Sequence, residues 1–387
     1  NNNNNNTIKK YNKQSSVQRD FSRATKWDIV YLTSSPLVFG SDPYKPLDQL
    51  DISGERDAFF NTLKASKQKL RVIHKTATTS NIIAAVTGGC RCIHYSGHGY
   101  PSYLAFEDAK RIGETHLVHY DLIRKVCEDE DQRIEFVFAS ACHSEHVGEA
   151  FIEAGIQHVV AVNTKFEVTD EAASVFTKHF YNTLLNGRTI EKSFKIAKHA
   201  VAAMSSSARL DYDKFLLLPR NGDHKVHIFG KLENGNLMDD TLITPTNNLP
   251  PAVPSFVGRA IDMRHIIHQL MDSGVRLLVL TGNSGIGKSA TALMVARYFC
   301  DRRMFRGGIF FIDVKKLNNE CDSLSAMLLK VFEECDVIKE HRKKYNNKHN
   351  HHHHRHHNSH HSHHSSNNSK KHRSTTSHHS NNNNNNN

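Results

Sequence analysis

Short apolar runs alternate with amphipathic stretches from Trp27 to about residue 230. We expect the apolar runs to form buried strands and the stretches between them to form helices. This cadence favours an α/β fold with a mostly parallel sheet covered by helices on both faces. The expected strands cover 28–32, 70–74, 90–95, 134–140 and 158–162, with a last pair at 215–218 and 224–229; the expected helices cover 56–65, 79–86, 118–127, 145–154, 170–186 and 189–204.

A second α/β pattern begins after a stretch that lacks periodicity. Residues 231–254 gather Asn, Gly, Thr and Pro, which is typical of an interdomain linker. The following pattern does not complete a domain before the low-complexity end of the chain, so we expect the natural protein to be longer or this chain to be a fragment. The expected elements are a helix at 260–272, a strand at 276–281, a helix at 288–300 and a strand at 308–313.

Both ends of the chain are rich in Asn, and the C-terminal end is also rich in His, Ser and Lys. Such segments bury too little apolar surface to offset chain entropy, so we expect them to be disordered. The His clusters bind Zn²⁺ or Ni²⁺ weakly at most, and a repeat without function is favoured. The expected organisation is a disordered 1–25, a first domain 26–230, a linker 231–254, the N-terminal part of a second domain 255–338 and a disordered 339–387.

The net charge of +11 is concentrated in the two ends of the chain. Residues 339–387 hold nine Lys and Arg against Glu340 alone, and residues 1–25 hold five against Asp20. The part expected to fold is therefore close to neutral and offers no basic face for specific nucleic-acid binding. No apolar run approaches the length of a membrane span, and no signal peptide opens the chain. Seven Cys without scaffold-like spacing suggest reduced thiols and a cytoplasmic location.

A complete phosphate-binding P-loop lies between the expected strand 276–281 and the expected helix 288–300. Its glycines let backbone N–H groups surround phosphate oxygens, Lys288 reaches the terminal phosphates, and Ser289 ligates Mg²⁺. We therefore expect ATP or ADP with Mg²⁺ to bind here. The residues of the loop are Gly282, Asn283, Ser284, Gly285, Ile286, Gly287, Lys288 and Ser289.

Hydrolysis of the nucleotide is less firmly predicted. It needs a further acidic residue at a strand end to hold the Mg²⁺ shell. Asp313 ends a suitable strand, but only one helix separates that strand from Lys288, so we interpret it as the neighbouring strand. The true acidic strand is not evident in the sequence.

The segment over about 254–335 resembles the STAND signalling ATPases of the NB-ARC group. The resemblance rests on Ser255–Arg259, the P-loop and the stretch Gly307–Asp313, although Ala260 replaces the usual acidic residue. It implies that Val257 and Arg259 lie against the nucleotide base. It also implies that nucleotide exchange controls assembly into a homo-oligomer.

Two chemically active side chains follow neighbouring expected strands. His98 stands between Gly97 and Gly99 after one strand, and Cys142 follows the next long apolar strand, 44 residues later. The carboxyl ends of parallel strands share one edge of a sheet, so the imidazole and the thiol are expected within reach of each other. Imidazole can deprotonate the thiol and later protonate a leaving amine. Gly99 allows its N–H to point at the reacting carbonyl and to form an oxyanion hole with the N–H of Cys142.

A zinc site is the alternative that the residues around this pair leave open. Alternate positions of a strand share a face, but no C-x-x-C spacing supports such a site. Its ligands would come from Cys90, Cys92, His94, His98, Cys142, His143 and His146. His143 itself has no role that the sequence suggests.

The stretch over about 27–230 resembles the CHAT family, caspase-like domains of the clan that includes caspases and separases. The matching segments are Tyr95–Gly99, Ser140–Cys142, Val168–Ala173, Phe180–Tyr181 and Leu184–Gly187. The resemblance implies an α/β/α sandwich, a His98/Cys142 dyad and hydrolysis of a protein or peptide substrate. Two other functions stay open: a CHAT fold acting as a non-catalytic adaptor, and a module that cuts only its own chain.

Two acidic residues are candidates for substrate specificity. Glu167 and Asp170 follow the strand expected at 158–162, which in this clan borders the pocket for the residue before the scissile bond. A carboxylate there favours Arg or Lys in the substrate. Thr169 or Asp170 can instead cap the helix that begins near Glu171. Capping is favoured for Asp170, which leaves Glu167 as the freer candidate.

Overall fold

The computed structural model describes residues 25–128, 133–229, 232–239, 247–272, 274–305 and 307–313. The chain divides into two units, residues 1–311 and 312–387, and Ile312 and Asp313 are the described residues of the second. The predicted disordered ends, the His-rich segment and the second domain beyond Asp313 lie outside the described residues, except Thr25.

A seven-stranded sheet forms the centre of the first unit. The apolar runs predicted as strands form β1 (Trp27–Ser34), β4 (Arg71–Thr76), β5 (Cys90–Gly97), β9 (Phe136–Ser140), β10 (His158–Val162) and β11 (Phe215–Leu218). The strand order is β11-β10-β9-β5-β1-β4-β12, and β11 alone pairs antiparallel in this sheet. The mostly parallel sheet expected from the sequence is therefore confirmed.

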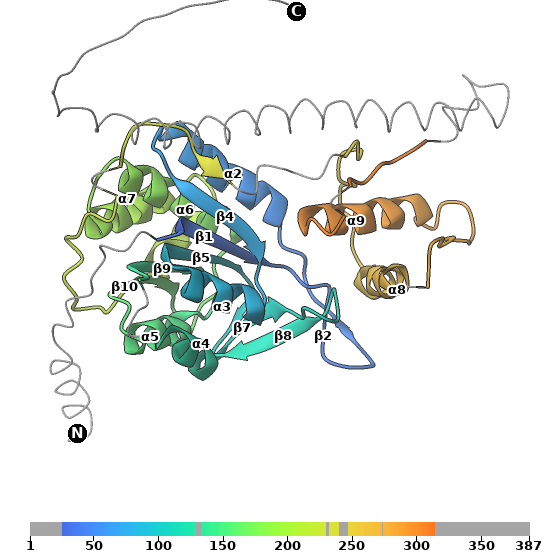
Figure 1. The fold of residues 1–387 in the computed structure, drawn as a ribbon, viewed down its shortest axis with the longest axis horizontal. Coiled ribbons are helices and arrows are strands. Elements are labelled where there is room, and N and C mark those ends of the chain that lie inside the picture. Colours follow the sequence, from blue (N-terminus) through green and yellow to red (C-terminus); the bar gives the residue numbers. More distant parts are fainter. Residues whose placement is uncertain are drawn as a thin grey trace, which may run out of the picture. The chain divides into compact units, whose positions relative to one another are not determined.

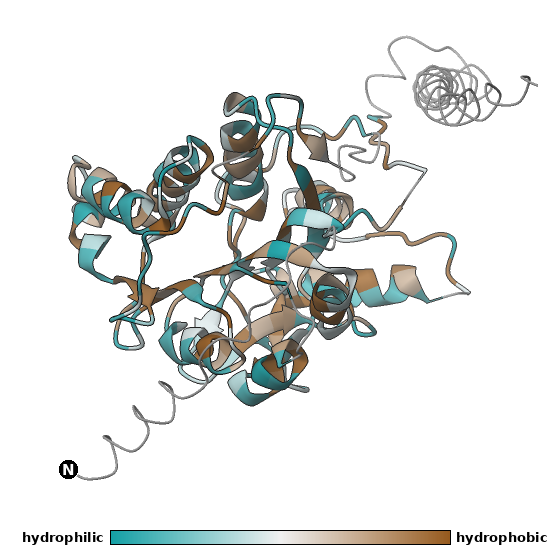
Figure 2. Ribbon diagram, turned by 60° about the vertical axis from the view of Figure 1, so that its left-hand side comes forward, coloured by the Kyte–Doolittle hydropathy of each residue, from teal (hydrophilic) through white to brown (hydrophobic). Residues whose placement is uncertain are grey.

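Helices cover both faces of this sheet, as Figure 1 shows. On one face lie α2 (Ile52–Ala65), α6 (Asp170–Leu185) and α7 (Ile190–Ala202); on the other lie α3 (Thr79–Gly88), α4 (Tyr120–Cys127) and α5 (Glu145–Glu153). Each face has its own buried apolar cluster, because alternate residues of every strand point to opposite sides. In Figure 2 the helices around the sheet carry both brown and teal residues, as expected for helices with one apolar and one polar side.

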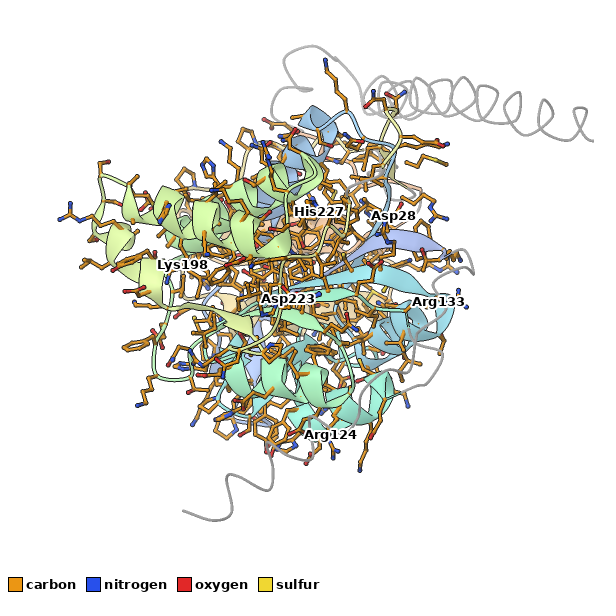
Figure 3. All side chains as sticks on the ribbon, turned by 90° about the vertical axis from the view of Figure 1, so that its left-hand side faces the viewer. Asp28, Arg124, Arg133, Lys198, Asp223 and His227 are labelled. Atoms are coloured by element: carbon orange, nitrogen blue, oxygen red, sulfur yellow. The ribbon has the colours of Figure 1, made fainter. Side chains whose placement is uncertain are left out.

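The outer surfaces of these helical layers carry charge. Figure 3 shows Lys198 of α7 and Arg124 of α4 extending away from a carbon-filled centre. Lys198 pairs with Asp213 at 2.7 Å, and Arg124 approaches Glu153 at 3.7 Å. Such exposed pairs contribute little to stability, so burial of apolar side chains on the two faces stabilises the fold.

A polar row runs along the carboxyl edge of the sheet, on the face covered by α2 and α6. In the parallel register Thr33 lies beside Ser96, and Ser96 lies beside Ser140. One layer further into the sheet Tyr31, His94 and Phe138 lie side by side. The sheet therefore changes from apolar to polar at the edge where β5 and β9 end, and helices that return from such an edge begin there.

A three-stranded antiparallel sheet was missed by the sequence analysis. It consists of β6 (Gly99–Tyr100), β7 (Tyr103–Glu107) and β8 (Thr115–His119). The helix predicted at 118–127 therefore begins two residues later than predicted, at Tyr120. His119 is its N-cap, and the ring of His119 accepts a hydrogen bond from the Asp121 N–H. A short two-stranded sheet, β2 (Val38–Phe39) with β3 (Lys45–Pro46), lies in the loop between β1 and α2.

Two expectations for residues 215–254 need correction. The predicted strand 224–229 is absent, because its backbone serves a helix instead: the carbonyls of His224 and Val226 accept from Glu191 N and Ile190 N at the start of α7. Part of the predicted linker joins the sheet as β12 (Met238–Asp239), which pairs with β4. The amide of Met238 donates to the Leu70 carbonyl at 2.6 Å, so the linker begins by adding an edge strand.

The segment around the P-loop contains two helices, α8 (Ala260–Met271) and α9 (Lys288–Asp301), close to the predicted bounds. The predicted strands 276–281 and 308–313 are not formed as strands. Leu277 and Val279 are 80% and 67% exposed, and Ile309 makes one isolated bridge to Asn247. A buried parallel strand needs neighbours on both sides, and the described residues supply no further strand of this second sheet.

Candidate active site

His98 is held at the end of β5 by a backbone carbonyl. Its Nε2 lies 2.8 Å from the carbonyl oxygen of Asp48, in the loop between β3 and α2. A carbonyl oxygen only accepts, so Nε2 carries the proton of this hydrogen bond. In the neutral imidazole the lone pair is then on Nδ1, which becomes the atom available as a base.

The backbone of Gly99 packs directly against that of Cys142. A Cβ atom at Gly99 would lie 2.1 Å from the Cys142 carbonyl oxygen and 2.9 Å from the Ala141 Cβ. The structure therefore brings together the two strand ends that carry His98 and Cys142. Glycine is required by this close approach, whereas we had expected it to provide an unusual backbone conformation; the φ of Gly99 is not among the positive ones.

The Cys142 thiol is partly buried against the segment that precedes α6. Its Sγ lies 3.5 Å from the amide N of Val168 and 3.9 Å from the carbonyl oxygen of the same residue. Burial raises the pKa of the Cys142 thiol above its usual value, the Val168 amide opposes this, and the carboxylates of Glu167 and Asp170 add to it. The thiol is therefore protonated near neutral pH, and it needs a base to become a nucleophile.

His143 also contacts the segment that precedes α6. It has a left-handed backbone, with φ of 56°, which is uncommon for a residue with a side chain. Its Nδ1 lies 2.5 Å from the Thr164 carbonyl oxygen, and its Nε2 lies 3.9 Å from Glu167 Oε1. His143, the residue after Cys142, is thus linked to the segment that ends at Val168, whose amide contacts Sγ. The sequence had given this residue no role.

The two acidic specificity candidates occupy different positions. Thr169 is the N-cap of α6: its hydroxyl accepts from the Ala172 amide, and both its N–H and hydroxyl donate to Asp211 Oδ2 at 2.8 Å. The interpretation of Asp170 as the cap is therefore wrong, and its side chain lies exposed in the first turn. Glu167 has a side chain that is 84% exposed, with His143 as its neighbour.

A partly buried carboxylate near this edge was not identified from the sequence. Glu55 of α2 accepts a hydrogen bond of 2.5 Å from the Ser96 hydroxyl, and its Oε1 lies 4.0 Å from Nε2 of the fully buried His94. Among the described residues neither Oε1 nor that Nε2 has a hydrogen-bond partner. Burial raises the pKa of Glu55 to about 7, with smaller contributions from Asp170 and Asp51, and burial lowers the pKa of His94 to about 3.

A sequence signal for Glu55 did exist. It lies four residues before Phe59, which is 2% exposed, so it belongs to the apolar stripe of α2. The helix was predicted to begin at residue 56, one residue too late to include it. An acidic side chain on the buried face of a helix is the kind of exception that marks a functional position.

The zinc alternative finds no support in the geometry. Within the part of the chain that the structure describes, no cluster of three or more His, Cys, Asp or Glu side chains is arranged to hold a metal ion. Cys90 and Cys92 are buried, and burial raises the pKa of both thiols. The described helices also include none that is long and apolar enough to cross a membrane.

The P-loop adopts the left-handed turns that its glycines allow. The φ angles are 143° at Gly282, 81° at Gly285 and 93° at Gly287, which is the N-cap of α9. Among the described residues no side chain caps this helix, so its first amides are available to an anion. The ammonium of Lys288 donates to the carbonyl oxygens of Gly282 and Asn283 at 2.9 and 2.8 Å.

Arg259 reaches the P-loop as well. Its guanidinium donates to the Ile286 carbonyl oxygen at 2.7 Å and pairs with Asp262 at 2.8 Å. Val257 is 82% exposed. The remaining loop residues Asn283, Ser284 and Ser289 are exposed, as an open phosphate cradle requires.

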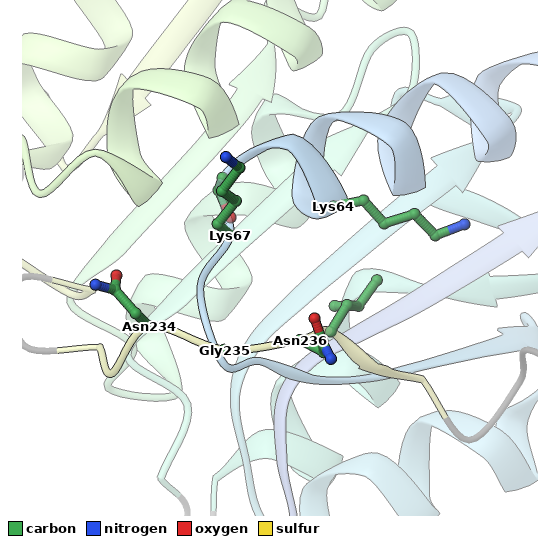
Figure 4. A pocket seen from close by; sticks show the side chains of 7 residues that line it. Lys64, Lys67, Asn234, Gly235 and Asn236 are labelled. Carbon is green, nitrogen blue, oxygen red and sulfur yellow. The ribbon is translucent and has the colours of Figure 1, made fainter.

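A separate hollow lies where α2 ends, at the opposite end of the helix from Glu55 (Figure 4). Lysines and the turn before β12 surround it, and it is remote in the fold from the strand ends that carry His98 and Cys142. It offers no thiol or carboxylate for catalysis. Its lining residues are Lys64, Ser66, Lys67, Asn234, Gly235, Asn236 and Leu237.

Comparison with known proteins identifies relatives that match part of the chain. A curated relative, the Roc-COR-CHAT protease of Runella zeae, is 26% identical over 191 residues, which cover 49% of this chain and 19% of that protein. Two solved structures are similar at low TM-scores. The Arg-specific cysteine proteinase gingipain R (RgpB) has a TM-score of 0.38 and 15% identity, covering 59% of this chain and 52% of that chain. The complex of Porphyromonas gingivalis RgpB pro- and mature domains has a TM-score of 0.36 and 14% identity, covering 59% and 53%.

A family model covers six of the seven strands of this sheet and the helices on both of its faces. The model, described as the CHAT domain, matches residues 22–231, from just before β1 to just beyond the segment that caps α7. The matched region contains the strand ends of β5 and β9, with His98, Gly99 and Cys142. The chain belongs to the CHAT domain family.

Proposed function

We propose that the CHAT domain is a caspase-like cysteine peptidase with His98 and Cys142 as its catalytic dyad. The observation that carries this proposal is the close approach of Gly99 to Cys142, which joins the two strand ends. The hydrogen bond from His98 to the Asp48 carbonyl supports it, because it leaves Nδ1 as the base. Membership of the CHAT family and the name of the Runella relative, a protease, agree with it.

The proposed reaction follows from these positions. His98 Nδ1 takes the proton from Cys142 Sγ, and the thiolate attacks the carbonyl carbon of the scissile peptide bond. The N–H groups of Gly99 and Cys142 stabilise the oxyanion that forms. The C–N bond then breaks, the leaving amine takes the proton from His98, and water hydrolyses the thioester to a carboxylic acid and the free thiol.

The acidic side chains near the thiol suggest a cationic substrate residue. Glu167 and Asp170 both act electrostatically on Cys142. A guanidinium or ammonium in this position would relieve their mutual repulsion, so we propose a preference for Arg or Lys before the scissile bond. A peptide-library profile that favours Asp or an apolar residue there would contradict this preference.

The P-loop is proposed to bind ATP or ADP with Mg²⁺. Left-handed glycines, an uncapped helix N-terminus and Lys288 form a donor set suited to phosphate, and Ser289 would contact the Mg²⁺. The bound ion would neutralise phosphate charge. Arg259 would fix the loop through the Ile286 carbonyl. We propose that nucleotide exchange controls self-assembly in the cytoplasm and thereby cleavage, with ATP hydrolysis negligible in this chain.

The dyad is tested by a cysteine-directed activity probe and two substitutions. Cys142→Ala and His98→Ala are each expected to abolish thiol-dependent cleavage and probe labelling. The double variant should be no worse than either single variant, because residues that act as one unit are non-additive. Substantial activity in His98→Ala would assign the base to another residue, such as His94 or His143.

The same experiment distinguishes the other possible functions. A non-catalytic adaptor would leave Cys142 unlabelled by the probe in the unmodified protein. A self-processing module would cut its own chain and no foreign peptide. Comparing labelling, self-cleavage and cleavage of a peptide library therefore separates the three functions.

A further inference from the structure

The carbonyl that holds His98 lies in a loop whose base is closed by hydrogen bonds. Residues 35–50 connect β1 to α2 and carry Asp48 near their end. The amide of Leu50 donates to the Ser35 hydroxyl at 3.2 Å, and the amide of Leu47 donates to the Leu37 carbonyl oxygen at 2.9 Å. The position of Asp48 therefore depends on how firmly Ser35 and Leu37 are fixed.

Ser35 is fixed by two charged side chains. Its amide donates to Glu107 Oε1 at 3.1 Å, and its carbonyl oxygen accepts from Arg302 Nη2 at 2.7 Å. Arg302 also binds both oxygens of Glu107, through Nε at 2.7 Å and Nη2 at 2.5 Å. Glu107 and Ser35 are each 5% exposed, so this group is screened from water.

Arg302 belongs to the P-loop segment and not to the sheet. It is the C-cap of α9, directly after Asp301, the last residue of the helix that begins at Lys288. Asp301 accepts from the Ser53 hydroxyl at 2.9 Å and lies 3.4 Å from Arg56 Nη1, in the first turns of α2. The end of α9 thus contacts the first residue of the loop 35–50, through Arg302, and the first turns of α2, through Asp301.

A second buried ion pair in the same apolar cluster provides an internal comparison. Arg264 of α8 binds Glu114, which is 1% exposed, and donates to the Tyr44 hydroxyl at 2.7 Å. Like Arg302, it stacks over a tyrosine ring. It differs in its contact with the loop 35–50, because Arg264 reaches Tyr44 in the far turn of the loop, whereas Arg302 reaches Ser35 at the base.

We propose that Arg302 is a positioning residue for the catalytic His98. By bridging Glu107 and the Ser35 carbonyl it fixes the base of the loop 35–50, and through that loop it holds the Asp48 carbonyl against His98 Nε2. This inference rests on the proposed dyad. One 14-residue helix then connects the phosphate-binding loop to the loop that orients the catalytic base, so changes at the P-loop reach the dyad through the end of α9.

Removal of the guanidinium has a definite chemical consequence. Of its donors in the described part of the chain, Glu107 would keep the Tyr298 hydroxyl, at 3.2 Å, and the Ser35 amide. A buried carboxylate without a cationic partner is unfavourable, so the side chain would turn towards water or take up a proton. Either change releases Ser35, and the Asp48 carbonyl no longer selects the tautomer of His98.

The experiment measures alkylation of Cys142 by iodoacetamide as a function of pH, followed by mass spectrometry of the peptide that contains Cys142. The full chain is compared as the unmodified protein, His98→Ala, Arg302→Gln and Arg264→Gln, with the melting temperature of each. We expect the His98-dependent rate of Cys142 alkylation in Arg302→Gln to be about ten-fold or more below that of the unmodified protein. Arg264→Gln is expected to lower the melting temperature similarly but to keep that rate and its pH profile.

Each outcome bears on one proposal. If the unmodified protein labels no faster than His98→Ala, the dyad fails and the positioning role fails with it. If labelling depends on His98 but Arg302→Gln matches the unmodified protein, the positioning role is wrong and the dyad stands. Equal slowing by Arg264→Gln also overturns it, since the effect would then be only structural.

A conservative variant covers the case in which Arg302→Gln does not fold. Arg302→Lys keeps a cation beside Glu107, but an ammonium cannot reproduce the fork that serves Glu107 and Ser35 together. We expect this variant to fold and to label more slowly than the unmodified protein. Full labelling in Arg302→Lys would show that the link to Ser35 is not needed.

Discussion

Glu55 is a partly buried carboxyl group beside the polar row at the edge of the sheet where β5 ends. It lies on the buried stripe of α2, accepts from Ser96 two residues before His98, and faces the neutral His94. Burial raises the pKa of Glu55 to about 7, so the proton is bound more tightly in the folded than in the unfolded protein. A protonated carboxyl can remain inside the polar row, whereas the ionised form must be accommodated without a cation.

The pH dependence of stability tests this assignment. Because the folded pKa is raised, the stabilisation is fully present below about pH 4.5 and is lost as the pH rises through 7. From pH 5 to pH 8 the free energy of unfolding should fall by about 2–3 kcal/mol on account of Glu55. Glu55→Gln, which keeps the shape and the Ser96 contact, should lack this component in urea titrations at several pH values.

A matched control uses Glu128, an exposed residue directly after α4. Glu128→Gln should leave the pH slope as it is in the unmodified protein, because an exposed carboxylate contributes little to stability. An unchanged slope in Glu55→Gln would mean that Glu55 is ionised in the folded protein throughout this range.

The ends of β5 and β9 show what a sequence pattern can and cannot predict about elements. Apolar runs predicted these parallel strands, and the residues that follow them predicted His98 and Cys142 as a pair at one edge. The antiparallel strands over 99–119 were missed because they are short and partly polar. The strand at 276–281 was predicted from its apolar residues, but a pattern does not state whether neighbouring strands are present.

Contacts between distant segments explain the remaining misses in the site. The role of His143 follows from its contacts with Thr164 and Glu167, and the role of Asp48 follows from its contact with His98. Such partners are separated by 20 or more residues and leave no periodic signal. Glu55, by contrast, carried a local signal and was missed because the helix was predicted to begin at residue 56, whereas α2 begins at Ile52.

The contact between Gly99 and Cys142, where β5 and β9 end, predicts how a single added methyl group affects stability and labelling. Gly99→Ala places a Cβ 2.1 Å from a backbone oxygen, and a backbone cannot yield as a flexible side chain can. We expect a loss of about 1–3 kcal/mol in the free energy of unfolding, together with loss of probe labelling at Cys142. Gly88→Ala at the end of α3 is the control, because a Cβ there meets nothing within 4 Å. Gly88→Ala should be neutral or slightly stabilising. Full probe labelling of Cys142 in Gly99→Ala would contradict the close contact between Gly99 and Cys142.

Across the first unit, the CHAT sheet and the P-loop helices share a buried interface. Leu37 and Val38, both fully buried, pack with Met263 and Ile267 of α8 and with Phe299 of α9. The buried pairs of Arg302 with Glu107 and of Arg264 with Glu114 add polar contacts at the same place. Apolar burial of this kind couples the unfolding of the parts that share it.

Nucleotide binding should therefore stabilise the CHAT sheet as well as the P-loop. Trp27 on β1 is the single tryptophan of the chain, so its fluorescence reports the sheet alone. At a nucleotide concentration 100-fold above Kd the linkage is worth about 2.7 kcal/mol, which corresponds to a rise of roughly 5 °C in the midpoint reported by Trp27. Lys288→Ala should bind no nucleotide, keep the Trp27 transition of the unliganded protein and show no shift. A Trp27 midpoint that stays constant while MgATP binds the unmodified protein would show that the two parts unfold independently.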